Sequence, residues 1–253
     1  MALSNTATTE SSSDVARKAS KRWREQRTKV DRDKVYSPLA AITLLKELGS
    51  AKFDEAVEAH FNLGLDVRKA DQMLRSTLTL PNGIGKTVTV AVFAQGEKAI
   101  EAEKAGADWV GNEELEAKIA GGWTDFDVCI ATPDMMATVG KLGRILGPRG
   151  KMPNPKTGTV TFDVGAAVEA TKGGKFEYRT DRTGIVHVVI GRKSFSIEQL
   201  VENYGAMYEE ILRAKPSSAK GRYVQSISLA TTMSPGVPVD SSIVRDFLVA
   251  DEG

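Results

Sequence analysis

Between residues 87 and 146, short apolar runs alternate with amphipathic segments, and this alternation restricts the fold more than any other feature of the chain. Residues 87–94, 107–110 and 127–131 predict strands, whereas 97–105 and 113–119 predict helices that end at glycines. A further helix is predicted over 135–146. Strands that alternate with helices in this way predict a parallel sheet with crossover helices.

The segments on either side of this block have another pattern. Alternating apolar and polar residues predict half-buried strands, and the cap residues Ser37 and Ser196, with Pro38 and Gly49, mark helix ends. The expected strands are 57–65, 75–80, 175–180, 184–191 and 222–232, and the expected helices are 38–48, 164–171 and 197–214. The predicted fold class is therefore mixed α/β and α+β, with a Rossmann-like α/β domain inserted into a discontinuous α+β domain.

The change of pattern also predicts domain boundaries. Residues 1–16, which are rich in Ser and Thr, are expected to be a disordered tail. Domain I is expected to comprise residues 17–82 and 175–253, and domain II residues 83–174. Paired glycines stand at both boundaries, and glycine absorbs large backbone rotations, so a hinge is predicted at Gly83, Gly85, Gly173 and Gly174.

Composition excludes several classes of protein. Among its 253 residues the sequence has one cysteine, Cys129, and two histidines, so we expect neither a disulfide scaffold nor a Cys/His zinc cage, and no metal or cofactor. No apolar stretch approaches the roughly 18 residues of a membrane span, and the first thirty residues lack the apolar core of a secretory signal. We therefore expect a cytoplasmic protein without a membrane partner.

Charge is sorted by region, although the formal net charge is only +1. Residues 17–34 carry nine Lys or Arg against three acids, and residues 141–156 carry five and no acid. The second region, rich in Gly and Pro, suits close approach to phosphates, although it is equally well interpreted as an exposed basic loop. Its candidates for a nucleic-acid contact are Lys141, Arg144, Arg149, Lys151 and Lys156.

No catalytic constellation emerges from the remaining candidates. The sequence Gly83-Ile-Gly-Lys-Thr resembles the end of a phosphate-binding loop, but Leu80 stands where that loop requires glycine, and a strand rather than a helix follows. His60 and His187 are interpreted as structural histidines. The rival interpretation, an α/β enzyme or nucleotide-binding protein, predicts a ligand at the carboxyl ends of the parallel strands, near Asp127 or Asp134.

Four segments resemble the L-one family of large-subunit ribosomal proteins: AKFDEAVE, LGRILGPRGKMPNPKTGTV, KGGKFEYRTDRTGIVH and SISLATTMSPG. The resemblance extends from about Lys21 to about Val239. It implies a non-enzymatic protein, monomeric when free, whose domain I binds 23S-type ribosomal RNA and forms the mobile stalk of the ribosome. It also implies contact with deacylated tRNA in the exit site, assistance in its release, and repression of translation by binding the protein's own messenger RNA.

The same resemblance implies a set of residues that contact ribosomal RNA. Hydroxyl groups on a sheet can donate to and accept from a 2′-hydroxyl or a phosphate, and an aromatic ring can pack on a base or sugar. Two positions depart from the family pattern: Ala56 replaces a common threonine, and Ser234 replaces a common glycine. The implied contacts are Lys52, Phe53, Glu58, Arg179, Arg182, Ser226, Thr232 and Met233.

Overall fold

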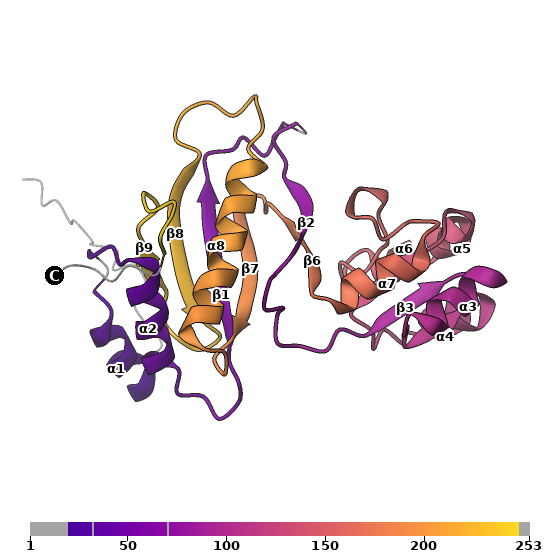
Figure 1. Cartoon of the computed structure of the whole chain (residues 1–253), viewed down its shortest axis with the longest axis horizontal. Helices are drawn as coiled ribbons and strands as arrows, with labels where there is room; N and C mark the ends of the chain where they lie inside the picture. Colours follow the sequence, from indigo (N-terminus) through magenta and orange to yellow (C-terminus); the bar gives the residue numbers. More distant parts are fainter. Residues whose placement is uncertain (1–19, 32, 70, 248–253) are drawn as a thin grey trace, which may run out of the picture.

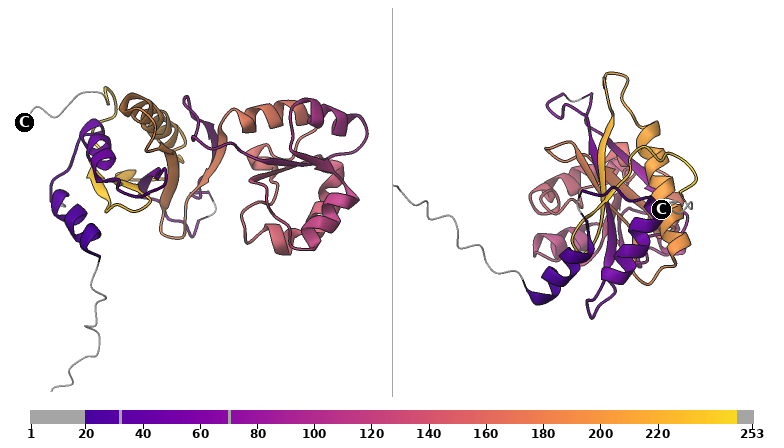
Figure 2. Two further views of the ribbon diagram at one scale, coloured as in Figure 1. Left: turned by 90° about the horizontal axis from the view of Figure 1, so that it is seen from below. Right: turned by 90° about the vertical axis from the view of Figure 1, so that its left-hand side faces the viewer.

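The computed structural model describes residues 20–31, 33–69 and 71–247, so the tail predicted over residues 1–16 lies outside them. The chain forms two parts of unequal size that are joined by a narrow two-stranded ribbon (Figures 1 and 2). We call them the larger part, which contains the first and last elements of the chain, and the smaller part, which contains the middle elements. The predicted mixture of α+β and α/β structure is confirmed.

The larger part is built on an antiparallel sheet in the order β7-β1-β8-β9. Helices α2 and α8 lie on one face of this sheet (Figure 2). Alternate residues of β1, among them Phe61, point to that face and are buried, and the ring of Phe61 stacks on Tyr204 and Tyr208 of α8. The bounds are α1 Lys21–Lys29, α2 Pro38–Leu48, β1 Ala56–Leu63, β7 Ile185–Arg192, α8 Ile197–Arg213, β8 Val224–Thr231 and β9 Val237–Val239.

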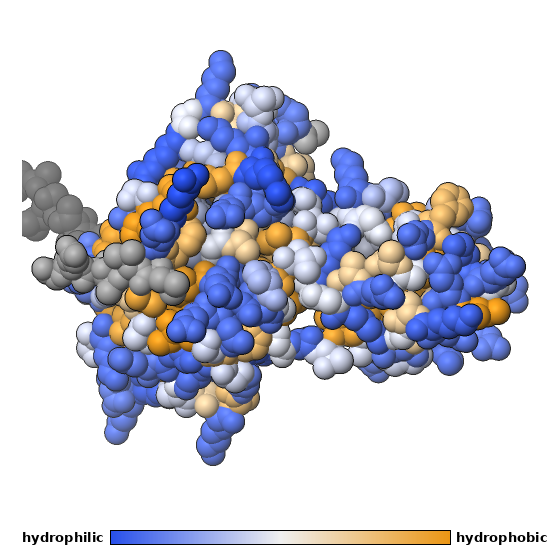
Figure 3. All heavy atoms as spheres, in the orientation of Figure 1, coloured by the Kyte–Doolittle hydropathy of each residue, from blue (hydrophilic) through white to orange (hydrophobic). Residues whose placement is uncertain are grey.

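The smaller part has a parallel sheet, as the alternation of strands and helices predicts. In this sheet β3 lies between β4 and β5. Helices α4 and α5 pack on one face and α3 and α7 on the other, so the sheet is buried on both sides. Hydrophilic side chains cover most of this part in the view of Figure 3. The bounds are β3 Val90–Phe93, α3 Glu97–Lys104, β4 Trp109–Gly111, α4 Glu113–Ala120, β5 Val128–Ala131, α5 Met136–Lys141, α6 Gly143–Leu146 and α7 Val164–Lys172.

The ribbon between the two parts consists of β2 (Arg75–Thr79) and β6 (Lys175–Arg179), which pair antiparallel. Two of the glycines predicted at the boundaries lie side by side here. A Cβ built on Gly174 would stand 3.2 Å from the Cα of Gly83, and both glycines have positive φ, +95° and +63°. The two connections between the larger and the smaller part therefore lie close together at Gly83 and Gly174, where a larger residue would be strained.

Most predicted elements occur within a few residues of their expected ends. Ser37 and Gly49 cap α2, and Ser196 forms a capping box with Gln199 at the start of α8. The single helix predicted over 135–146 is wrong, since a 3-10 turn at Pro133–Met135 and the two short helices α5 and α6 replace it, divided at Leu142. Helix α1 and strand β9 were not predicted.

One buried polar side chain fastens the ribbon to the core of the larger part. Asn203 of α8 is fully buried. Its amide nitrogen donates to the carbonyl oxygens of Ile190 and Gly83 at 2.7 and 3.0 Å, and its amide oxygen accepts from the backbone N–H of Asn82 at 3.1 Å. Asn203 thus holds Asn82 and Gly83, which follow β2, against Ile190 of β7.

We predict that Asn203→Ala lowers the free energy of unfolding by about 2–3 kcal/mol, because it removes the partners of several buried backbone groups. The measurement is urea denaturation at neutral pH. Glu209→Ala, at an exposed position of the same helix, serves as the control and should change stability by less than about 0.5 kcal/mol. Equal effects of the two substitutions would contradict the prediction.

Candidate nucleic-acid interface

Three loops meet at one end of the four-stranded sheet, because β1 begins where its antiparallel neighbours β7 and β8 end. Backbone bonds connect them: the N–H of Thr232 donates to the carbonyl of Ala56 at 3.1 Å, and the N–H of Lys193 donates to the carbonyl of Glu55 at 2.8 Å. We call residues 50–55, 192–195 and 231–234 the loop cluster.

A buried carboxylate, Glu55, lies at the centre of the loop cluster. One carboxylate oxygen accepts from the backbone N–H of Ala51 at 2.9 Å. The other accepts from the hydroxyl of Thr231 at 2.7 Å and from the backbone N–H of Met233 at 3.1 Å. Glu55 thus ties the loop before β1 to the loop after β8.

The electrostatics of Glu55 favour its charged form. Burial by itself raises the pKa of this carboxyl. The hydrogen bonds from the hydroxyl and the two backbone N–H groups, together with the positive charge of Arg22, outweigh burial, so the pKa of Glu55 is lowered. The carboxylate is therefore ionised at neutral pH.

A second acid ties the same loop to the turn after β7. The carboxylate of Asp54 accepts from the backbone N–H and the hydroxyl of Ser194, at 3.0 and 2.8 Å. Phe53, which directly precedes Asp54, projects into solvent with 54% of its surface exposed. Met233, on the loop after β8, is 49% exposed. Two large apolar side chains are thus held outward on a fixed backbone.

The hydroxyl of Thr232 is oriented by the backbone beside it. Its oxygen accepts from the N–H of Ala56 at 3.1 Å. Because a hydroxyl has one proton and two lone pairs, this bond leaves the proton of Thr232 available to an acceptor outside the protein. Lys52, two residues before Asp54, is exposed on the same cluster.

The face of the sheet opposite α2 and α8 carries a row of polar side chains, which we call the outer strip. It consists of Glu58, His60 and Asn62 on β1, with His187 on β7 and Ser226 and Ser228 on β8. His60 is paired with His187 on one side and with Ser228 on the other, and Asn62 is paired with Ser226. The strip begins next to the loop cluster and extends along β1 to the far end of the sheet.

The structure brings some of the residues implied by the family resemblance together and separates others. Lys52, Phe53, Thr232 and Met233 lie in the loop cluster, and Glu58 follows on the outer strip. Ser226, Arg179 and Arg182 lie toward the other end of the sheet, where the bridge between Thr180 and Val186 connects β6 to β7. The two groups are joined by the outer strip.

Helix α1 places the N-terminal basic residues beside the loop cluster. Its only buried residue is Gln26, whose amide donates to the carbonyl of Leu48 at 2.6 Å and to the hydroxyl of Ser50 at 3.0 Å. Sequence reasoning found the charge of this segment but not the helix, because polar contacts rather than an apolar stripe hold it in place. Its cations are Lys21, Arg22, Arg24, Arg27 and Lys29.

The basic region 141–156 is only partly the exposed loop that was predicted. Lys141 ends α5 and pairs with Glu116 at 3.3 Å, and Arg144 lies within α6. The ammonium group of Lys151 points inward and donates to the backbone carbonyls of Thr124 and Phe126, so this cation is used inside the smaller part. Arg144, Arg149 and Lys156 are exposed.

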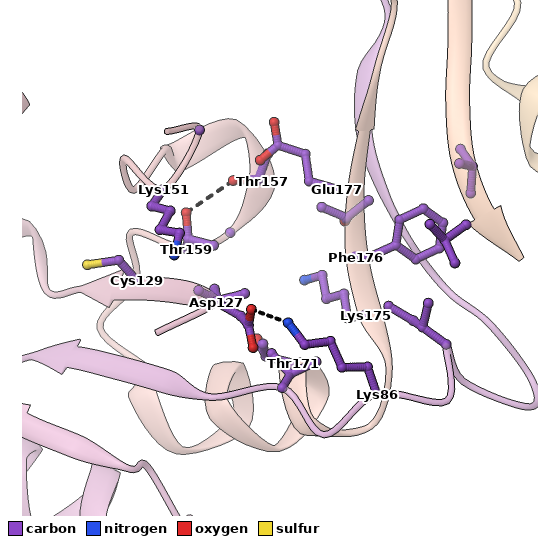
Figure 4. A pocket seen from close by; sticks show the side chains of 18 of the residues that line it. Lys86, Asp127, Cys129, Lys151, Thr157, Thr159, Thr171, Lys175, Phe176 and Glu177 are labelled. Carbon is purple, nitrogen blue, oxygen red and sulfur yellow. Dashed lines mark hydrogen bonds and ion pairs between the residues drawn. The ribbon is translucent and has the colours of Figure 1, made fainter. Parts of the chain in front are cut away.

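A cavity of about 490 Å³ lies beside the ribbon, between the smaller part and β7 (Figure 4). In it Lys86 pairs with Asp127 at 2.5 Å. Burial raises the pKa of Asp127, but hydrogen bonds from Lys86 and Thr89 lower it overall. Asp127 immediately precedes β5, at the amino end of the parallel sheet, so it does not lie at the carboxyl end where the rival interpretation needs a ligand. Asp134, the other residue of that interpretation, follows β5 in the 3-10 turn Pro133–Met135 and does lie at the carboxyl end.

Within the described ranges, no group of three or more His, Cys, Asp or Glu side chains is arranged to hold a metal ion. In the same part of the chain, no helix is long and apolar enough to cross a membrane.

Comparison with known proteins places this architecture in a family. Residues 44–235 match the model of the ribosomal protein L1p/L10e family. The chain is 61% identical to the large ribosomal subunit protein uL1 of Rubrobacter xylanophilus over 229 residues, which cover 90% of this chain and all of that protein. It is 56% identical to the protein of the same name from Corynebacterium glutamicum (91% and 98% covered) and 59% identical to that from Rhodococcus erythropolis (91% and 97%).

The chain belongs to the ribosomal protein L1p/L10e family, and the resemblance found in its sequence is confirmed. Its relatives are structural proteins of the large ribosomal subunit rather than enzymes. The rival interpretation of the chain as an α/β enzyme is therefore set aside.

We predict that Glu55→Gln lowers the free energy of unfolding at neutral pH by about 1–3 kcal/mol, because an amide cannot satisfy all three donors. Since the pKa of Glu55 is lowered by folding, its charge stabilises the fold above the ordinary carboxyl value of 4.5. That contribution is lost as the pH falls through the folded-state pKa. The difference between the variant and the wild type should therefore shrink in acid.

Denaturant titrations at several pH values measure this difference. Glu47→Gln, on the exposed surface of α2, is the matched control and should leave stability unchanged within about 0.5 kcal/mol. A Glu55→Gln protein as stable as the wild type at neutral pH would show that the carboxylate does not hold the loops.

Proposed function

We propose that the loop cluster and the outer strip form the surface by which this protein binds large-subunit ribosomal RNA in the cytoplasm. The observation that carries the proposal is the fixed exposure of Phe53 and Met233 beside the oriented hydroxyl of Thr232. Exposed apolar side chains that share one loop cluster with an oriented hydroxyl group suit contact with a partner, whereas a single exposed apolar residue does not by itself mark a site. Membership in a ribosomal protein family supports RNA as the partner.

The residue types on this surface suit folded RNA. Proteins recognise RNA largely through its shape, its 2′-hydroxyls and the stacking of unpaired bases. The ring of Phe53 can stack on a base or sugar, the free proton of Thr232 can be donated to a 2′-hydroxyl or phosphate oxygen, and Lys52 can neutralise a phosphate. Glu58, which repels phosphate, is suited to accept a hydrogen bond from a 2′-hydroxyl.

The cations of α1 extend this surface on one side, and Arg179 and Arg182 extend it at the far end of the sheet. An RNA that contacts both ends has to follow the outer strip. The charge is thus placed around a polar, shape-selective centre rather than spread over the whole protein, which agrees with a net charge of only +1.

The ribbon connects the part that is proposed to bind ribosomal RNA to the smaller part. We infer that the backbone at Gly83, Gly85, Gly173 and Gly174 acts as a hinge between domain I, which is held on ribosomal RNA, and domain II, which swings as the mobile stalk. Positive φ at Gly83, Gly85 and Gly174, and the direct contact of Gly83 with Gly174, support this location. Gly173 has φ −71° and caps α7, so its contribution is the end of that helix.

The swinging part is proposed to contact deacylated tRNA in the exit site and to assist its release. Arg144, Arg149 and Lys156 are the exposed cations that support this role. We further propose that the loop cluster binds a segment of the protein's own messenger RNA that imitates the ribosomal site. One surface cannot hold both RNAs at once, so free protein represses translation only when ribosomal RNA is saturated.

We predict that Phe53→Ala and Thr232→Val each weaken binding to the stalk region of large-subunit ribosomal RNA about tenfold or more. The first removes a stacking surface, which is worth about 1–3 kcal/mol per base, and the second removes the hydroxyl proton. Filter binding at one fixed salt concentration measures the affinity, and Thr232→Ser should restore most of it.

The matched control for Phe53→Ala is Phe162→Ala, because Phe162 is 62% exposed but lies in the smaller part. It should bind the RNA as the wild type does. Wild-type affinity in both the Phe53 and the Thr232 variants, with unfolding free energies unchanged, would overturn the placement of the RNA site.

The separate roles of the two proposed nucleic-acid surfaces can be tested by replacing Arg144, Arg149 and Lys156 together with alanine. Ribosomes that carry this variant should release exit-site tRNA more slowly, while binding of the isolated protein to ribosomal RNA keeps its affinity and its salt dependence. A protein with three fewer phosphate contacts would instead lose about two to three units of the slope of log K against log salt. Such a loss in ribosomal RNA binding would contradict the division of roles.

A further inference from the structure

The two histidines of the chain face each other in the middle of the outer strip. His60 on β1 and His187 on β7 are directly paired across the strands. Their Nδ1 atoms are 2.9 Å apart, and the rings meet edge to face with centroids 5.0 Å apart. The sequence separates these residues by 127 positions, so only the register of the sheet brings them together.

This contact fixes the protonation of the pair. At 2.9 Å one Nδ1 has to donate its proton and the other has to accept it. The contact therefore holds only one proton on the two Nδ1 atoms and is lost if both rings become imidazolium. Burial lowers the pKa of His60 and the neighbouring His187 lowers it further, while Glu58 acts in the opposite direction.

Each histidine has a carboxylate near its other nitrogen. Nε2 of His60 is 3.9 Å from the carboxylate of Glu58, and Nε2 of His187 is 3.5 Å from that of Asp181. On β8 the residue opposite His60 is the uncharged Ser228. His187 also borders the cavity beside the ribbon, whose charged lining residues are Lys86, Asp127, Lys151, Lys175, Glu177 and Arg192.

The nearest carboxylates therefore stabilise a first positive charge on the pair, but mutual repulsion opposes a second. His187 keeps about half of its side chain, 52%, open to solvent, and it lies at the edge of the strip that the proposed RNA site uses. A phosphate placed against this face would supply the missing negative charge, since anions close to an imidazole favour its protonated form.

We propose that His60 and His187 are RNA-contact residues that take up a proton when a phosphate of the RNA binds to the outer strip. The proton taken up is the second one on the pair. With both rings in the imidazolium form, both Nδ1 atoms carry hydrogens, so the Nδ1–Nδ1 contact breaks and an Nδ1–H can donate to a phosphate oxygen. This inference rests on the proposed function, because it assigns a role within the same RNA surface.

The consequence is that RNA binding depends on pH in the range where histidine titrates. By linkage, uptake of one proton strengthens binding by up to tenfold for each unit that the pH falls between the pKa of the pair in the complex and its lower pKa in the free protein. We expect the affinity of the wild type for a stalk-region ribosomal RNA fragment to rise about tenfold between about pH 8 and about pH 5.5.

The test compares wild type with the double variant His60→Gln, His187→Gln across this pH range at constant ionic strength. Glutamine keeps a polar side chain that can form a neutral cross-strand hydrogen bond but cannot gain a proton. The double variant should bind with an affinity that does not rise between about pH 8 and about pH 5.5, because neither side chain can gain a proton. The unfolding free energy of the double variant is measured alongside, so that a loss of fold is recognised.

A second measurement follows the imidazole protons of the wild type by NMR with and without the RNA fragment. The pKa of at least one histidine should rise on binding, whereas a structural pair would keep its values. A wild type that binds the fragment equally well at all pH values, or a double variant that retains the wild-type pH dependence, would overturn the inference while leaving the RNA site standing. Absence of binding at every pH would overturn the proposed function and this inference with it.

Discussion

The proposed RNA-binding surface of this protein depends on the buried carboxylate of Glu55. Three hydrogen bonds, from Ala51, Thr231 and Met233, allow one side chain to fix two loops that are about 180 residues apart in sequence. An ionised group away from water is tolerated only when its acceptor positions are filled. The chain therefore cannot rearrange these loops without exposing or neutralising Glu55, and so Phe53 and Met233 remain in solvent instead of folding back onto the sheet.

A second constraint is the double crossing of the chain between the two parts. Because the smaller part is inserted, its two connections have to run side by side, and β2 and β6 do so as a paired ribbon. Gly83 and Gly174 permit the close approach, and Asn203 fastens one crossing to the larger part. The two parts are thus connected by a few residues next to a fixed anchor, which supports the proposal of a hinge at this place.

The sequence predicted those features that depend on local periodicity and caps. The helix after Ser37, the helix after Ser196 and the parallel strands of the smaller part follow from residue spacing alone. The elements that were not predicted depend on contacts between distant residues. Helix α1 is held by Gln26, which reaches the end of α2. Strand β9, which contains Pro238, is held by pairing with β8 and by a bridge between Val239 and Tyr36. Glu55 and the histidine pair could not be predicted, because burial of the first and register of the second are set by the folded sheet.

Hydroxyl-radical footprinting of the free and RNA-bound protein shows whether RNA covers the loop cluster, because Phe53 and Met233 are exposed side chains that radicals oxidise. Phe162, exposed in the smaller part, supplies an internal reference of the same chemistry. If the loop cluster binds RNA, ribosomal RNA from the stalk region should protect Phe53 and Met233 strongly and leave oxidation of Phe162 unchanged. Full oxidation of Phe53 and Met233 in a saturated complex would contradict it.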